Sequence, residues 1–95
     1  MTDLLAFDPE RIMDEWRRFY DWAVLSRQRL QIIEEIGTLG QKFSSLLSAY
    51  RHTLQSQRRS QLAAELRAIR DAMQAYYEQC SQKDRPALDL SGPSA

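Results

Sequence analysis

The sequence predicts an all-α protein, a small antiparallel bundle or hairpin of two to three helices that self-associates. Apolar side chains recur at helical spacing in three successive runs. Only three glycines and three prolines interrupt the 95 residues, and each run is offset in heptad phase from the one before it. Turns between three helices explain these offsets most simply. Two long helices in a hairpin, or one continuous rod that must oligomerise, are the alternatives.

The first helix is expected over residues 9–36. Asp8 can cap free backbone amides, and Pro9 suits the first helical position, where its missing N–H costs nothing. The apolar side chains that follow occupy two faces of the helix. One face carries Ile12, Trp16, Phe19, Ala23, Leu30 and Ile33, and the other carries Trp22, Leu25, Ile32 and Ile36. One face can pack on the remaining helices, so the other is expected to meet a further partner.

The second and third helices are expected over residues 39–56 and 60–82. A break is predicted at 37–40, because Gly37 can close a helix and Thr38 with Gln41 has the spacing of a capping box. The polar stretch 55–61 is the second break. The second apolar run is Ile36, Leu39, Phe43, Leu46 and Tyr50, and the third is Leu62, Leu66, Ile69, Met73, Tyr76 and Cys80. The third run is a narrow stripe, which favours packing against another helix of this chain or of a second copy.

The two ends of the chain differ in composition from the helical domain at 9–83. Residues 1–8 are expected to form a flexible arm, and residues 84–95, which contain two prolines and a glycine, a flexible tail. Leu5 and Phe7 are apolar enough to fold back over the first helix. Leu88 and Leu90 could dock on a partner.

Composition places the chain among globular proteins. Thirteen basic and thirteen acidic residues cancel, so no overall charge draws the molecule toward nucleic acid or an anionic membrane. The single cysteine cannot form an internal disulfide, and no apolar run approaches the roughly 18 residues needed to span a bilayer. We therefore expect a cytoplasmic protein that is not inserted in a membrane.

Crowded aromatic residues indicate a protein interface. Trp and Tyr supply large contact areas with few rotatable bonds, which is why they anchor interfaces. The candidate interface residues are Trp16, Phe19, Tyr20 and Trp22 of the first helix and Leu62, Leu66, Ile69, Met73 and Tyr76 of the third run. Arg17 and Asp21, four residues apart, are expected to pair on the solvent side.

A basic cluster is the second candidate site. Arg51 and Arg58 are seven residues apart and would share a helical face, with Arg59 beside them, so phosphate could bind there. No glycine-rich loop or helix-turn-helix signature accompanies the cluster. His52 and Cys80 are the only histidine and the only cysteine, and no spacing in the sequence indicates catalysis, a metal site or a cofactor.

The sequence thus favours a non-enzymatic helical interaction module, acting as an adaptor, an assembly or export chaperone, or a structural subunit of a larger complex. The alternative is a small nucleic-acid-associated protein that uses the basic cluster. In size and expected shape the chain is similar to many small helical proteins of bacteria and phages, a likeness of outline that identifies no family.

Overall fold

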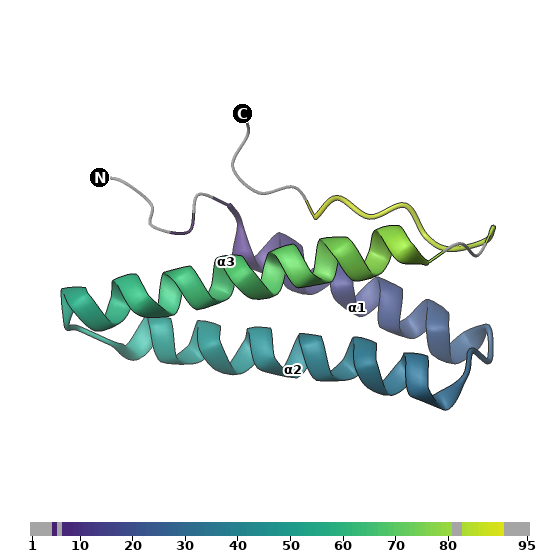
Figure 1. Ribbon diagram of the computed structural model, residues 1–95, viewed down its shortest axis with the longest axis horizontal. Helices are drawn as coiled ribbons and strands as arrows, with labels where there is room; N and C mark the ends of the chain where they lie inside the picture. The colour runs from purple at the N-terminus through teal and green to yellow at the C-terminus, as the bar shows by residue number, and fades with distance from the viewer. Residues whose placement is uncertain (1–4, 6, 81–82, 91–95) are drawn as a thin grey trace.

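Three α-helices make up the fold in a computed structural model that describes residue 5, residues 7–80 and residues 83–90. They are α1 (Pro9–Leu25), α2 (Leu30–His52) and α3 (Ser56–Gln79). The described residues contain no strand, which confirms the predicted all-helical class. The molecule measures 43 × 27 × 17 Å. Helices α2 and α3 lie side by side along their lengths, and α1 packs against α2 on the far side of the view (Figure 1).

Helix α1 begins as expected but ends eleven residues early. The Asp8 carboxylate accepts a hydrogen bond from the backbone N–H of Glu10 at 3.0 Å, and Pro9 takes the first helical position. The predicted extent of 9–36 was wrong, because the chain turns at 26–29. The Ser26 hydroxyl donates to the Trp22 carbonyl at 2.7 Å, and Arg27 adopts a left-handed conformation with φ 56°. That conformation normally favours glycine, so composition gave no sign of this turn.

Helix α2 runs without interruption through the two glycines at which the break was predicted, so that break was also wrong. Neither Gly37 nor Gly40 has a positive φ. Both face α1 at close range: a Cβ built on Gly37 would lie 3.3 Å from Cε2 of Tyr20, and one on Gly40 would lie 3.1 Å from Cδ1 of Trp16. The glycines therefore serve helix packing, where the absence of a side chain admits two aromatic rings.

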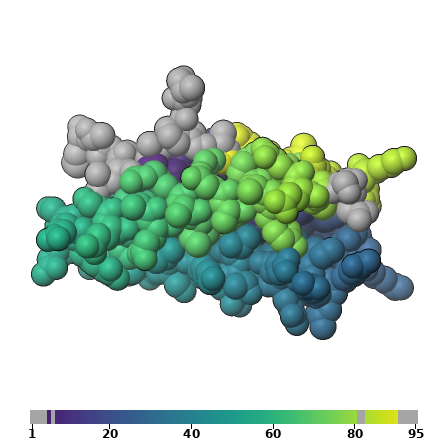
Figure 2. Space-filling view, viewed as in Figure 1, coloured from purple at the N-terminus to yellow at the C-terminus, as the bar shows by residue number. Residues whose placement is uncertain are grey.

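The second turn lies at 53–55, a little earlier than the sequence suggested. Thr53 helps to end α2 by donating from its hydroxyl to the Ala49 carbonyl at 2.6 Å. Helix α3 begins at Ser56 rather than at residue 60 and ends at Gln79 rather than at 82. Residues 81 and 82 lie outside the described residues. In space-filling view α2 and α3 are in contact along this whole face of the molecule (Figure 2).

All three apolar runs meet in one core. The Phe19 ring contacts the Trp16 ring edge-on, with centroids 5.1 Å apart, and the Tyr77 ring at 5.3 Å. Trp16 also donates from its indole N–H to the backbone carbonyl of Ile36 at 2.7 Å. The fully buried large side chains are Phe19, Phe43, Ile12, Ile36, Leu62, Leu66, Met73 and Leu90.

Both ends of the described chain fold back onto this core. Leu5 and Phe7 are buried, and the Phe7 ring lies 6.2 Å from that of Phe43, as the apolar character of this arm suggested. The rest of the arm, residues 1–4 and 6, lies outside the described residues.

Residues 83–90, which we call the C-terminal strap, return along α3 instead of extending away as a tail (Figure 1). Leu90 is buried, and its carbonyl accepts a hydrogen bond from Arg70 of α3 at 2.7 Å. The backbone N–H of Asp89 donates to Glu15 of α1 at 3.1 Å. The strap therefore links α1 to α3, and the alternating Leu88 and Leu90 supply the apolar contact that draws it in. Residues 91–95 of the expected tail lie outside the described residues.

Arg85 of the strap closes the end of α3. Its guanidinium donates to the carbonyls of Tyr77 and Cys80 and lies over the Tyr77 ring, 4.3 Å from the ring centroid. The last carbonyls of a helix have no partner within the helix, and a cation there also complements the negative end of the helix dipole. One side chain thus provides both the cap and the anchor of the strap.

Candidate interaction surfaces

The predicted interface residues divide into a buried group and a partly exposed group. Trp16, Phe19, Leu62, Leu66 and Met73 are buried in the chain's own core. Trp22, Ile69 and Tyr76 are half-buried, and Tyr20 is 38% exposed. The stripe on α3 therefore finds its partner within the same chain, and in this fold only the second group reaches the surface.

An apolar surface that is not among the predicted interface residues lies at the turn between α1 and α2. We call it the turn surface, and it consists of Val24, Leu25 and Leu30. Their exposed fractions are 44%, 83% and 69%. Leu25 is the last residue of α1 and Leu30 the first of α2, so four residues of turn hold both at one end of the molecule. In the single helix predicted over residues 9–36, Leu25 and Leu30 would lie mid-helix on different faces, so the sequence pattern does not reveal that they share one end of the molecule.

Leu54 is the most exposed large apolar side chain among the described residues, at 94%. It lies in the 53–55 turn, at the opposite end of α2 from Leu30. No other large exposed apolar side chain among the described residues lies with it. A single exposed leucine is common on protein surfaces and indicates no site.

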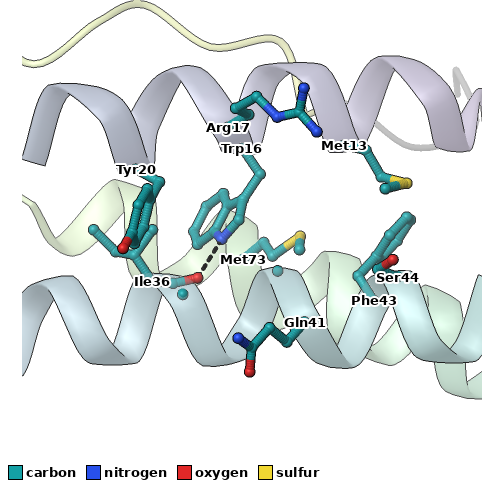
Figure 3. A pocket seen from close by; sticks show the side chains of 11 residues that line it. Met13, Trp16, Arg17, Tyr20, Ile36, Gln41, Phe43, Ser44 and Met73 are labelled. Carbon is teal, nitrogen blue, oxygen red and sulfur yellow. Dashed lines mark hydrogen bonds between the residues drawn. The ribbon is translucent and has the colours of Figure 1, made fainter. Parts of the chain in front are cut away.

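A groove with a cavity of about 320 Å³ that is open to solvent separates α1 from α2 on one side of the molecule. Trp16 and Tyr20 stand at one end of this α1–α2 groove, Met13 and Phe43 face each other at the other end, and Met73 of α3 closes the back (Figure 3). Gly37, Gly40, Gln41 and Ser44 form its α2 side.

Arg17 lies along α1 at the rim of the groove (Figure 3). The expected pair with Asp21 does not form, and Arg17 makes no ion pair with any residue that the structure describes. The neighbouring Arg18 pairs instead with Glu15 at 3.0 Å.

Trp22 has an unusual environment. Its ring stacks on Phe19, with centroids 5.6 Å apart and planes 7° from parallel. Its indole nitrogen is buried and has no hydrogen-bond acceptor among the described residues. A shallow depression beside the ring is bordered by Leu25 and by Pro86 of the strap, so Trp22 lies next to the turn surface.

The basic cluster is largely engaged within the molecule. Arg51 pairs with Glu10 of α1, and the Arg59 guanidinium lies over the Tyr50 ring, 4.7 Å from its centroid. The turn at 53–55 separates Arg51 from Arg58, so the single helical face expected for these arginines does not exist. Nothing in this arrangement favours phosphate binding over the internal contacts.

The groups considered for chemistry are far apart. His52 ends α2 and Cys80 follows α3, at opposite ends of the molecule (Figure 1), so they form no pair. Burial raises the pKa of Tyr76 to about 12, and the nearby Glu35 carboxylate adds to the rise. No cluster of metal-binding side chains occurs within the described ranges.

Comparison with known proteins finds no matching family model, no matching curated protein and no matching solved structure. None of the helices in the described part of the chain has both the length and the apolar character to cross a bilayer. The function must therefore be argued from the surfaces of this chain.

Proposed function

We propose that this chain is a non-enzymatic, cytoplasmic protein–protein interaction module, an antiparallel helical bundle that associates through its turn surface. Self-association is the form of the proposal tested first. Docking on a larger assembly, as an adaptor, chaperone or structural subunit, would use the same residues.

The turn surface is the observation that supports this role. Exposed apolar side chains scattered singly need no explanation, but grouped ones commonly mark an interaction site. Leu25 and Leu30 are both more than half exposed and flank one short turn, with Val24 beside them. Burying a leucine side chain in an interface stabilises a complex by about 1.5–3 kcal/mol relative to leaving it in water.

The turn is also built to hold its shape. Ser26 bonds back to Trp22, and the Gln28 N–H donates to the Ala23 carbonyl at 3.0 Å. Little ordering is then needed when a partner binds, which lowers the entropic cost of association.

The test compares molar mass by light scattering over a range of concentrations for three proteins: wild type, Leu25→Glu/Leu30→Glu, and Leu54→Glu. We expect the mass of the wild type to rise with concentration and that of the double variant to stay at one chain. Leu54→Glu, which introduces the same kind of charge at an isolated leucine, should behave as the wild type.

A wild-type protein that stays monomeric throughout would refute self-association. The docking form is then tested by quantitative affinity capture from the native host with the same three proteins. Proteins retained by wild type and Leu54→Glu but lost by the double variant would support docking at the turn surface. The proposal fails if no captured protein shows that difference.

A further inference from the structure

The α1–α2 groove has the features of a small-molecule site separate from the turn surface. We propose that it binds a small amphiphilic carboxylate, whose apolar tail enters the cavity and whose carboxylate pairs with Arg17. This inference does not depend on the proposed function.

The cavity suits an apolar tail. Its volume of about 320 Å³ lies at the lower end of the roughly 300–1,000 Å³ typical of ligand pockets. The buried side chains Trp16, Phe43 and Met73 lie beneath its floor, and Met13 and Tyr20 provide the apolar surface that is accessible from the groove. An apolar chain placed there leaves water for an apolar surface, and methionine side chains adapt readily to the shape of a ligand.

Two features shape this space. Because Gly37 and Gly40 have no side chains, the Tyr20 and Trp16 rings pack directly against α2 at one end of the groove. The Trp16 ring is held in place by its hydrogen bond to the Ile36 carbonyl, so it is not free to fall into the cavity.

The charge at the rim selects an anion. Arg17 is the one lining side chain that is charged at neutral pH, and it has no ion-pair partner among the described residues. The acidic residues nearest to Arg17 along α1, Asp14, Glu15 and Asp21, lie outside the lining. Gln41 and Ser44 add hydrogen-bond donors on the α2 side. An alkylammonium would face a like charge in the same position.

The experiment is a titration of the isotopically labelled full chain with octanoate, followed by two-dimensional NMR. We expect saturable shifts of the Gly37 and Gly40 amides and of the Trp16 indole N–H. Octylammonium and octanol, which have the same tail, should bind more weakly. Arg17→Gln should weaken octanoate binding about three- to tenfold, the range for a partly solvated charge pair. Arg58→Gln removes the same charge far from the groove and should leave the affinity unchanged.

A second pair of variants tests the location. Ser44→Leu places a larger side chain at the rim and should reduce binding at least tenfold, whereas Ser45→Leu, one position along α2 and outside the lining, should not. The inference is overturned if folded wild-type protein shows no saturable shifts or shows them away from the groove. It is equally overturned if octylammonium binds as well as octanoate.

The result can be separated from that of the proposed function. Leu25→Glu/Leu30→Glu leaves the groove lining intact and should bind octanoate as the wild type does, whatever its oligomeric state.

Discussion

The two glycines of α2, Gly37 and Gly40, should respond differently to replacement by alanine: one variant should raise the free energy of unfolding and the other should lower it. Alanine is favoured over glycine inside a helix by about 0.8–1.0 kcal/mol. Because both Gly37 and Gly40 lie within α2 and neither has a positive φ, propensity alone would stabilise both variants equally. The difference must come from what each new methyl group meets.

The two sites differ in the freedom of the facing ring. At Gly37 the methyl group would lie 3.3 Å from Cε2 of Tyr20, whose partly exposed ring can move outward. At Gly40 it would lie 3.1 Å from Cδ1 of Trp16, a buried ring held by its hydrogen bond to Ile36. Overpacking a well-filled core costs about 1–3 kcal/mol. We therefore expect Gly37→Ala to stabilise the protein by about 0.5–1 kcal/mol and Gly40→Ala to destabilise it by about 1 kcal/mol.

Urea unfolding followed by far-ultraviolet circular dichroism measures both free energies, with similar denaturant slopes indicating comparable transitions. The test is whether the changes in the free energy of unfolding for Gly37→Ala and Gly40→Ala have opposite signs. Equal stabilisation by both alanines would show that Trp16 is not held as the structure indicates. If both alanines destabilised the protein, the result would favour the turn predicted at 37–40 over a continuous helix, because alanine is destabilising where a glycine has a positive φ.

Two other predictions concern α3 and its surroundings. Arg85→Ala should lower the free energy of unfolding by about 1–2 kcal/mol, because it removes charged hydrogen bonds to α3 carbonyls and the contact with Tyr77. The control Lys83→Ala, at an exposed position of the strap, should change the free energy of unfolding by less than about 0.5 kcal/mol. If urea unfolding gave the same loss for Arg85→Ala and Lys83→Ala, the capping role of Arg85 would be wrong. The ionisation of Tyr76 can be followed by an ultraviolet pH titration, as the difference between the wild type and Tyr76→Phe. We expect it near pH 12 rather than pH 10, and we expect Glu35→Gln to lower that pKa. The raised pKa means that the folded state holds the Tyr76 proton more tightly than the unfolded state does, so the stability contributed by the protonated hydroxyl is present below pH 10 and is lost between pH 10 and 12. If Tyr76 instead ionised near pH 10, its hydroxyl would be solvated and the prediction would be wrong.

The number of helices could be predicted from the sequence, whereas the first turn could not. The offset between the second and third runs does coincide with a turn, at 53–55, but the offset between the first and second runs lies inside α2. The first run keeps its phase through the real turn at 26–29, so the expected count of three helices agrees with the structure although one of the two breaks behind it was misplaced. Arg27 occupies a conformation that usually favours glycine, while the true glycines of α2 serve close packing. Glycine has both uses, and only the three-dimensional contacts distinguish them.

The candidate surfaces were predicted less well, for a related reason. A stripe such as Leu62, Leu66 and Met73 indicates that a partner helix exists, but not whether that helix belongs to the same chain. Leu25 and Leu30 have ordinary apolar character, and they become a surface only because a turn brings two helix ends together. The α1–α2 groove is formed by side chains of different helices and by the glycines of α2, so the spacing of apolar residues within one run cannot predict it.

The path of the C-terminal strap bears on how the protein should be handled. A proteolytic cut between α3 and Leu88 would release Leu90 from its buried position in the core and from its hydrogen bond to Arg70, while leaving the three helices uncut. The cleaved protein would keep its helical circular dichroism spectrum but would expose apolar side chains that the strap had covered. It could therefore be mistaken for intact protein that aggregates. Mass measurement before any binding assay would tell the two apart.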